Sequence, residues 1–435
     1  MMPRILLTLL APMWLLSLAS ESPLLFAQST APAPSSAKPS AARTKAKKKF
    51  KKKSGQVIAP QVQTIASDHF LLHTDLSEEA SQELLVRLET MLELISKYWG
   101  RPNARPIEMY VVKDVSVWPS GTIPPPGLDA IRSGGGITIN RTLQRIDPSG
   151  QKEIVAAEAV VYAVSDHGTP QHEAVHAYCA QTFGRTGPVW YAEGMAEMGK
   201  YWREQDASVN CGPEVVDYLK SQPPKPLAEI TAAGQQTGDS WQNYAWRWAL
   251  CQLLANNTNY APRFRPLGLS LLTQQEASFE GVYGSMAEEI AFEYLFFLEH
   301  FDRGYRVDLC SWDWSAKFTT LKGAAGVQAK IDAGRGWQAS RLSAVKSVTY
   351  EYSSMGRWRV DPEEDETTPQ GAADGRGKLM GVLWDDYRLS KPFELGESGT
   401  WTAPQSGKLF LRCQDDWCDL ADNRGTVTVK WKIVK

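Results

Sequence analysis

The chain has 435 residues, which is too long for a single hydrophobic core, so about two or three domains are expected. Its composition, with 43% hydrophobic and 22% charged residues and a net charge of −2, is that of an ordinary soluble globular protein. No recognisable nucleic-acid-reading module is present, so a nucleic-acid partner is not expected.

Residues 1–27 have the pattern of a secretory signal peptide. Arg4 precedes an apolar run from Ile5 to Ala19, and small residues follow this run. An uncleaved anchor is the alternative, but the run is short for a membrane span and contains Pro12. No later segment is long and apolar enough to cross a bilayer. We therefore expect an exported protein, in the periplasm, at the cell surface or outside the cell, with no transmembrane segment after signal cleavage.

Residues 28–56 are rich in Ala, Pro, Ser and Lys, and they predict a disordered linker because they contain almost nothing apolar to bury. Residues 1–55 carry a net charge of +9, which leaves −11 for the rest of the chain. This basic segment is interpreted either as a tether to anionic surface polymers or lipid, or as a solvated spacer.

The six cysteines are an even number, which suits an oxidising compartment, although the sequence does not determine their pairing. Cys413 and Cys418 are close together in the chain, so a local disulfide between them is the expected pair. Cys179 follows a histidine-rich motif and is interpreted as a small buried side chain or a disulfide partner rather than as a metal ligand.

Hydrophobic patterning from residue 57 onward predicts a first domain of mixed helices and strands, up to about residue 335. Leu84, Leu88 and Ile95 recur at helical spacing in an amphipathic helix that Gly100 ends. Strands are expected at residues 69–75, 106–114, 134–140 and 159–164, and further helices at residues 240–255 and 286–301.

The segment "HEAVH" carries two histidines four residues apart. On a helix, His172 and His176 lie one turn apart on the same face, close enough to share one metal ion. Glu173 lies beside that face, where it can accept a proton from a water instead of binding the metal. Pro170 fits the first turn of such a helix. The pattern fixes only three positions and is therefore only moderately specific.

A catalytic zinc needs a third protein ligand and an open position for water. A third histidine six residues further on is absent, because that residue is Thr182. Glu193, in "WYAEGMAE", follows His176 by seventeen positions, enough for the first helix to end at Gly184 and a second helix to run alongside. Glu197 lies one turn beyond Glu193 and can hydrogen-bond a ligand histidine.

"HEAVH" followed by "WYAEGMAE" resembles the gluzincin metallopeptidases, and more narrowly the secreted bacterial peptidase-MA-like proteins. This resemblance implies zinc ligands at His172, His176 and Glu193, with Glu173 as the general base. It also implies an α+β fold with a small sheet whose edge strand, here residues 159–164, lines a cleft above the zinc helix. An extended peptide could add to that edge through backbone hydrogen bonds.

The transition state of amide hydrolysis needs a further donor for its oxyanion. Tyr244 is our candidate, and Tyr283 is held in reserve. A packed aromatic side chain is the alternative interpretation of Tyr244. His167 precedes the motif helix and could face substrate, but a loop histidine without a role is the simpler interpretation.

Residues 336–435 alternate short strands with polar turns, which predicts an antiparallel β-sandwich. The stretch "APQSGKLFLRCQDDWCDLADNRGTVTV" resembles the calcium-dependent galactophilic lectins of bacteria. That resemblance implies side-chain oxygen ligands for Ca²⁺ from Asp415, Asp422 and Asn423, with Asp419 supplying its carbonyl. The alternative is an Asp-rich turn that is merely solvated.

Together these patterns predict an exported zinc metallopeptidase in which Glu173 activates a zinc-bound water to hydrolyse a protein or peptide. The sandwich would localise the enzyme on a surface glycan. The alternative is a non-catalytic cell-surface or glycan-binding protein with a silent zinc-peptidase fold.

Overall fold

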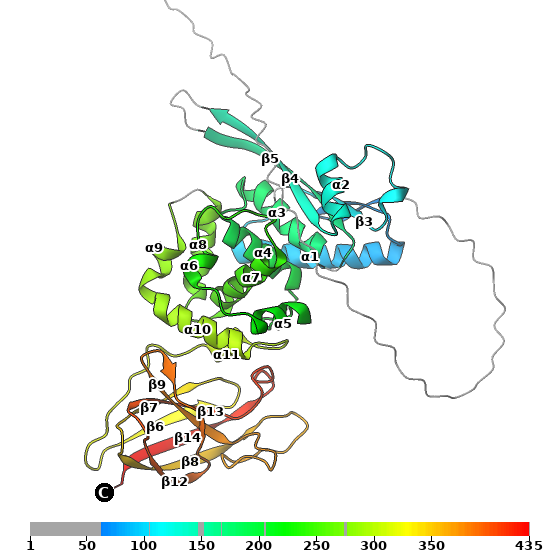
Figure 1. Cartoon of the computed structure of the whole chain (residues 1–435). Coiled ribbons are helices and arrows are strands. Elements are labelled where there is room, and N and C mark those ends of the chain that lie inside the picture. The colour runs from blue at the N-terminus through cyan, green and yellow to red at the C-terminus, as the bar shows by residue number, and fades with distance from the viewer. Residues whose placement is uncertain are drawn as a thin grey trace, which may run out of the picture.

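The computed structural model describes residues 62–103, 105–146, 152–166, 168–203, 206–273 and 276–434, and gives the backbone alone for 142–146 and 152–156. The expected signal peptide and linker lie outside the described residues. The described chain has an α+β fold, as predicted, in which a mixed sheet and its helices are followed by two antiparallel sheets (Figure 1).

The first sheet has the strand order β1-β2-β3-β5-β4. β2, β3 and β5 are parallel neighbours, while β1 is antiparallel to β2 and β4 is antiparallel to β5. The strands are β1 (Gln63–Ala66), β2 (Phe70–Thr74), β3 (Ile107–Val112), β4 (Gly136–Ile146) and β5 (Lys152–Val164).

The edge strand on the β5 side of this sheet is β4, which corrects the expectation that residues 159–164 form the edge. Those residues lie in β5, which pairs with β3 on one side and with β4 on the other. The reason is the long hairpin that β4 and β5 form, with a register that runs from Gly136 opposite Ala163 to Ile146 opposite Lys152. This hairpin occupies the side of β5 that would otherwise be free.

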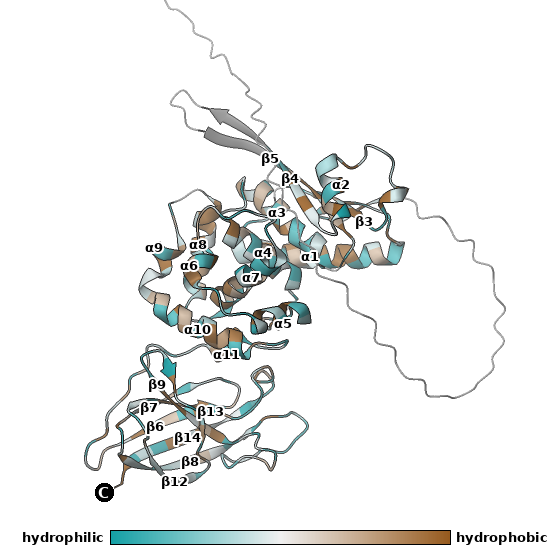
Figure 2. Cartoon of the chain, viewed as in Figure 1, coloured by the Kyte–Doolittle hydropathy of each residue, from teal (hydrophilic) through white to brown (hydrophobic). Residues whose placement is uncertain are grey.

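Helix α1 (Glu78–Trp99) is the amphipathic helix that the sequence predicts, and its ribbon in Figure 2 carries both hydrophilic and hydrophobic residues. The Ser77 side chain caps its start by accepting a hydrogen bond from the Ala80 N–H. Gly100 ends it in the left-handed conformation, at φ 68°.

Helices cover both faces of the first sheet. α1 and α3 (Thr169–Phe183) pack on one face, where Leu72 and Val161 point into the same core as Leu88. α2 (Pro125–Arg132) covers the other face together with Trp118. The metal-motif segment therefore lies in a helix between the sheet and the helices that follow.

The remaining helices form the rest of the first core. They are α4 (Val189–Tyr201), α5 (Pro213–Ser221), α6 (Leu227–Ile230), α7 (Trp241–Asn256), α8 (Ala261–Leu272), α9 (Phe279–Tyr283), α10 (Ala287–His300) and α11 (Val307–Cys310), with short 3-10 turns η1 (Val115–Val117) and η2 (Gly284–Met286). α7 and α10 are the two later helices that the sequence predicts. α4 packs against both α3 and α7, so it brings the second half of the motif next to the first.

Two antiparallel sheets pack face to face in the C-terminal part, which is the predicted β-sandwich. One sheet has the order β10-β9-β13-β7, with β11 paired to β9, and the other has the order β12-β8-β14-β6. The strands are β6 (Gly326–Asp332), β7 (Gln338–Ala344), β8 (Thr349–Arg359), β9 (Leu379–Asp385), β10 (Arg388–Leu389), β11 (Phe393–Glu394), β12 (Ser398–Thr402), β13 (Gly407–Cys413) and β14 (Arg424–Ile433). Because β6 pairs with β14, the sandwich includes residues that precede the boundary expected at 336.

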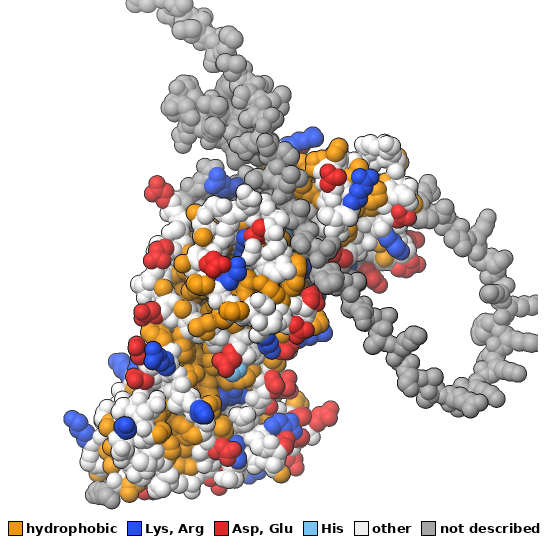
Figure 3. Space-filling view, viewed as in Figure 1, with side chains coloured by type: hydrophobic (Ala, Val, Ile, Leu, Met, Phe, Trp, Pro, Cys, Tyr) orange, Lys and Arg blue, Asp and Glu red, His pale blue; other side chains and the backbone are white. Residues whose placement is uncertain are grey.

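An aromatic cluster joins α10 to the sandwich. Phe292 and Phe296 of α10 pack with Trp312, Phe410 and Val382. In the space-filling view of Figure 3, acidic and basic side chains are interspersed over the helical part and the sandwich. The two parts of the chain therefore share a buried apolar contact.

All six cysteines lie in the described part of the chain, and none forms a disulfide. The expected pair Cys413–Cys418 is therefore wrong. Cys413 points into the sandwich core, whereas Cys418 packs at the margin of the helical core, so the two side chains belong to different environments. No helix in the described residues is long and apolar enough to span a membrane.

Candidate metal centre

Helix α3 carries the first half of the motif in a fully buried position. Asp166 accepts hydrogen bonds from the Gly168 and Thr169 N–H groups at the helix start, and Pro170 lies in its first turn. The helix ends at Gly184 in the left-handed conformation, as predicted. His172 and His176 consequently lie one turn apart on the same helix.

Helix α4 brings Glu193 over the two histidines because small residues let it approach its neighbours closely. A Cβ atom on Gly194 would lie 2.8 Å from the Arg247 carbonyl oxygen of α7. A Cβ atom on Gly199 would lie 2.4 Å from the Val175 side chain of α3. Only glycine fits at both contacts, so the "EG" pair of the motif combines Glu193 with the glycine that positions it.

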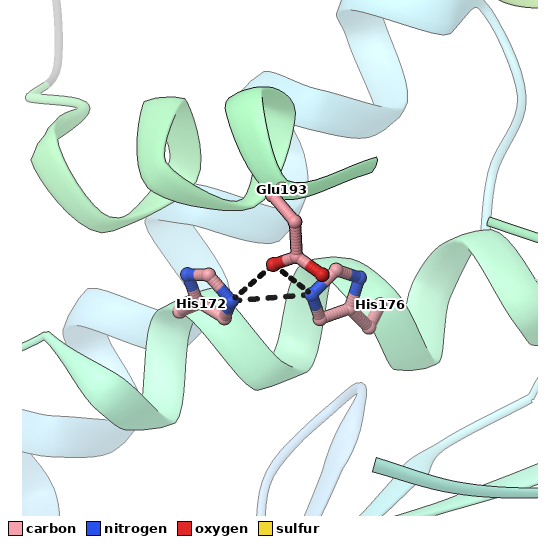
Figure 4. A group of neighbouring side chains, drawn as sticks. All are labelled: His172, His176 and Glu193. Atoms are coloured by element: carbon pink, nitrogen blue, oxygen red, sulfur yellow. Dashed lines mark hydrogen bonds and ion pairs between the residues drawn. The ribbon is translucent and has the colours of Figure 1, made fainter. Parts of the chain in front are cut away.

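Figure 4 shows His172, His176 and Glu193 pointing toward one another from the two helices. Nε2 of His172 and Nε2 of His176 are 3.1 Å apart. Oε2 of Glu193 lies 3.3 Å from Nε2 of His172 and 3.4 Å from Nε2 of His176. A tetrahedral zinc ion with ligand bonds of about 2.0–2.1 Å separates its ligand atoms by about 3.3–3.4 Å. The three distances are close to this spacing, so the three atoms together can hold one metal ion.

Glu197 fixes the orientation of one histidine ring. Its Oε1 lies 2.9 Å from Nδ1 of His172. Although burial favours its neutral form, the charges and hydrogen bonds of Lys200 and His172 lower the pKa of Glu197 to about 2, so it accepts the hydrogen bond. Nδ1 of His172 is then the donor, which leaves Nε2 to face Glu193.

The electrostatics of the group favour a bound cation. Burial works against a charge on His172, but hydrogen bonds to Glu193 and Glu197 outweigh it and raise its pKa to about 10. Burial also works against a charge on Glu193, but the charge of His176 and hydrogen bonds from both histidines hold its pKa below the ordinary value. The buried carboxylates of Glu193 and Glu197 need positive charge nearby, either from a proton or from a metal ion.

Glu173 lies beside the three ligand residues and is completely buried. Its Oε2 accepts a hydrogen bond of 2.8 Å from the Thr138 hydroxyl of β4, while its Oε1 has no hydrogen-bond partner in the described residues. Burial raises the pKa of Glu173 above the ordinary value. A Cβ atom on Gly136 would lie 2.8 Å from the Glu173 side chain, so glycine there lets β4 approach.

The loop between α6 and α7, residues 231–240, contacts the centre from another side. Thr237 donates a hydrogen bond of 2.5 Å to Oε1 of Glu193, the oxygen other than the one that pairs with the two histidines. Asp239 in the same loop forms a two-armed ion pair with the buried Arg247, at 3.0 and 2.7 Å. His172, His176 and Glu193 are at most 1% exposed, so the centre is closed to solvent.

The structure places Tyr244 at the centre. Its ring stacks on His172 with centroids 5.7 Å apart, and its hydroxyl accepts a hydrogen bond of 2.8 Å from the Gly238 N–H. Tyr283 is elsewhere: its hydroxyl donates to the Tyr260 carbonyl and its ring packs against Phe279. His167 lies outside the described residues.

The expected calcium residues lie in the turn between β13 and β14. Asp415 and Asn423 are buried, and Asp415 Oδ2 and Asn423 Oδ1 have no hydrogen-bond partner in the described residues. The carboxylates of Asp415, Asp419 and Asp422 do not converge as closely as the ligand atoms of the two-histidine group. The turn thus offers two unsatisfied oxygens but no compact carboxylate cluster.

Sequence reasoning missed Thr138 and Thr237, which hydrogen-bond Glu173 and Glu193. Neither threonine is near the motif in the chain. The one signal for Thr138 was its place in a predicted strand, and the signal near Thr237 was the Gly–Asp–Ser start of α7.

No family model matches the chain, and no curated protein matches it. The N-terminal domain of EclA, a PllA-like lectin, is 18% identical over 25% of this chain and 96% of that chain, with a TM-score of 0.22. IMPa from Pseudomonas aeruginosa, solved in complex with an O-glycopeptide, is 12% identical over 50% of this chain and 23% of that chain, with a TM-score of 0.17. Identities and TM-scores this low carry no functional argument.

Proposed function

We propose that the protein is an exported zinc-dependent peptidase. The observation that carries the proposal is the spacing of 3.1–3.4 Å between Nε2 of His172, Nε2 of His176 and Oε2 of Glu193. Two histidines and one glutamate are a donor set of catalytic zinc sites, and they leave one position open. When bound there, zinc would polarise the scissile carbonyl and lower the pKa of a water.

The chain's own residues supply the proton transfers. Glu173 accepts a proton from the attacking water at its free Oε1 and passes it to the leaving amine. Thr138 holds the other oxygen, Oε2, at 2.8 Å and so fixes the orientation of the carboxylate. Burial raises the pKa of Glu173, which makes it a better base than an exposed glutamate.

Tyr244 is the proposed donor to the developing oxyanion. Its hydroxyl oxygen accepts a hydrogen bond from the Gly238 N–H, and the hydroxyl also hydrogen-bonds Thr237, so its proton can turn to the oxyanion when the 231–240 loop moves. The ring stacks on His172, which places it next to the ligand residues. Burial and the charge of Glu193 raise the pKa of Tyr244, which keeps the hydroxyl protonated.

A protein or peptide is the proposed substrate. Among the described residues β4 is the edge strand of its sheet and lies beside α3, and an extended peptide could pair with that edge through backbone hydrogen bonds. Because the centre is closed, part of the 231–240 loop has to move before a substrate reaches Glu173. The hydrogen bond from Thr237 to Glu193 is one contact that this movement would break.

Peptide cleavage by the zinc-loaded protein tests the proposal. A mixture of unstructured peptides would be incubated with wild type and with Glu173→Gln, and the products would be identified by mass spectrometry. We expect cleavage by wild type and a loss of about 100-fold or more in the variant, which keeps the metal ligands but has no base. Equal cleavage by both proteins, or none by zinc-loaded wild type, would contradict the proposal.

The second candidate function is non-catalytic binding to a surface glycan. The buried unpartnered oxygens of Asp415 and Asn423 favour it, because such oxygens could hold Ca²⁺ next to a sugar. Calcium titration of wild type and Asp415→Asn would test this site. Calcium-dependent glycan binding that persists in Glu173→Gln, without proteolysis by wild type, would favour this function over the peptidase.

A further inference from the structure

A cavity of about 540 Å³ lies between the segment that follows α11 and the strands β6 and β7. None of its lining residues belongs to the metal centre or to the turn between β13 and β14. Its volume falls in the range of small-molecule sites, about 300–1,000 Å³. We propose that this cavity binds an anionic glycan, that is, an oligosaccharide carrying sulfate or carboxylate groups.

Four exposed cations line the cavity: Lys317, Lys330, Arg335 and Arg341. None of the four takes part in an ion pair with another described residue. The one acid in the lining, Asp313, accepts hydrogen bonds from the backbone N–H and the hydroxyl of Ser315 instead. The cavity therefore has an excess of unpaired positive charge, which a ligand with two or more anionic groups would balance.

The backbone at Arg341 is arranged in an unusual way. Arg341 has φ 65°, in the left-handed region that non-glycine residues rarely adopt. β7 bulges here, since Ala339 is opposite Phe410 and Ser343 is opposite Lys408, which leaves three residues of β7 against one of β13. Bulges redirect side chains, and strained backbone clusters at binding sites. The strand thus departs from regular geometry at a residue that lines the cavity.

The lining favours a glycan over a nucleic acid. Trp337 is the one aromatic side chain among the lining residues, and it is 5% exposed. A nucleobase would need a free aromatic face for stacking, which this buried ring does not offer. Ala316 and Ala339 are small and partly exposed, so a sugar ring has room to lie against them while the cations bind its charged groups.

The lining also favours a glycan over an acidic peptide. A peptide strand would need free backbone groups at the edge of β7. Thr319 already occupies this edge: its N–H donates to the Arg341 carbonyl at 2.8 Å, and its carbonyl accepts from the Ser343 N–H at 3.0 Å. Gln338 holds the adjoining turn through hydrogen bonds to the backbone of Asp332, so the cavity wall is preorganised.

Calorimetric titration of the full chain tests the proposal, with a heparin-derived tetrasaccharide and an oligogalacturonate as the two anionic probes. Maltotetraose is the neutral probe, and a glutamate-rich peptide of equal charge is the protein probe. The cavity variant is Lys330→Gln with Arg335→Gln. The matched control is Lys346→Gln with Arg388→Gln, which removes two exposed cations of the sandwich that do not line the cavity. All three proteins keep the basic N-terminal segment, so its contribution is constant.

We expect one or both anionic glycans to bind wild type, and the cavity variant to weaken that binding by about tenfold or more while the control changes it less than about twofold. Oligogalacturonate carries carboxylates alone and the heparin tetrasaccharide carries both groups, so binding of oligogalacturonate shows that carboxylates suffice, whereas binding of heparin alone shows that sulfates are needed. An equal loss in both variants would mean diffuse electrostatic attraction and would overturn the proposal. If the glutamate-rich peptide binds as tightly as the anionic glycans, the ligand is not specifically a glycan. If maltotetraose binds as tightly as they do, the ligand need not be anionic. Either result would overturn the proposed ligand class.

Discussion

Thr237 and Glu193 form a hydrogen bond of 2.5 Å between a loop hydroxyl and the carboxylate of a proposed metal ligand. The bond engages Oε1, which leaves Oε2 directed at the two histidines. A loop residue therefore selects which oxygen of Glu193 faces the metal position, and it also links closure of the loop to the geometry of the centre.

Thr237→Val removes this hydroxyl at nearly constant volume. We expect the zinc affinity to fall by about tenfold, because hydrogen bonds that orient metal ligands typically contribute that much or more. Competition with a fluorescent zinc chelator measures the effect. Thr237→Ser is the control, since it keeps the hydroxyl and should bind zinc within about twofold of wild type. A valine variant with unchanged affinity would show that the bond has no orienting role.

Glu197→Gln is expected to weaken zinc binding by about 10–100-fold. The glutamine amide still reaches Nδ1 of His172 but lacks the negative charge that raises the basicity of the ring. Chelator competition measures the loss, and circular dichroism checks that the fold is intact. Full zinc affinity in this variant would mean that the bond of 2.9 Å is only structural.

Gly194→Ala is expected to destabilise the protein by about 1–3 kcal/mol. The new methyl group would lie 2.8 Å from the Arg247 carbonyl oxygen and would push α4 away from α7. Gly281→Ala is the comparison, because its nearest neighbour, the Ser278 hydroxyl at 3.2 Å, is at the tip of a side chain. Denaturant unfolding of both variants gives the free energies, and equal values would contradict the close contact.

His300, at the contact of α10 with the sandwich, makes stability depend on pH. Its ring stacks on Trp417 with centroids 4.8 Å apart, and burial, followed by the charges of Arg412 and Lys220, lowers its pKa to about 4. An unfolded histidine has a pKa of about 6.5, so between these values the unfolded chain binds a proton that the folded chain does not. The free energy of unfolding should therefore fall as the pH drops from about 6.5 to 4.

Urea unfolding at several pH values measures this dependence. His300→Gln lacks the titrating ring, so its unfolding free energy should change less over the same pH range than that of wild type, whatever its absolute stability. If the unfolding free energy of both proteins depends on pH with the same slope, the pKa of His300 is not lowered in the folded chain, and the prediction is wrong.

Local pattern was sufficient to predict much of the fold and the residues of the centre. The helical spacing of His172 and His176 predicts that they share one face of a helix. The place of Glu193 beside them, on a second helix, was expected from the second half of the motif and from its resemblance to metallopeptidases. The position of residues 159–164 in the sheet was not predictable in the same way, because it depends on pairing with β4. Thr138 and Thr237 reach the centre through tertiary packing, and local periodicity carries no information about such contacts.

The disulfide prediction failed for a related reason. Cys413 and Cys418 are close in sequence, but Cys413 is the last residue of β13 and points inward, while Cys418 follows in a turn that contacts the helical core. Side-chain direction at the end of a strand depends on the register of the sheet, which the spacing of two cysteines does not reveal.

Zinc content per chain tests the central claim most directly. Elemental analysis of the purified protein would be made on wild type, His176→Ala and Glu193→Ala, with circular dichroism to confirm that each variant is folded. We predict about one zinc per chain in wild type, and a sharp reduction in both folded variants, because each removes one of three ligands. Zinc absent from wild type, or retained in full by folded Glu193→Ala, would contradict the account.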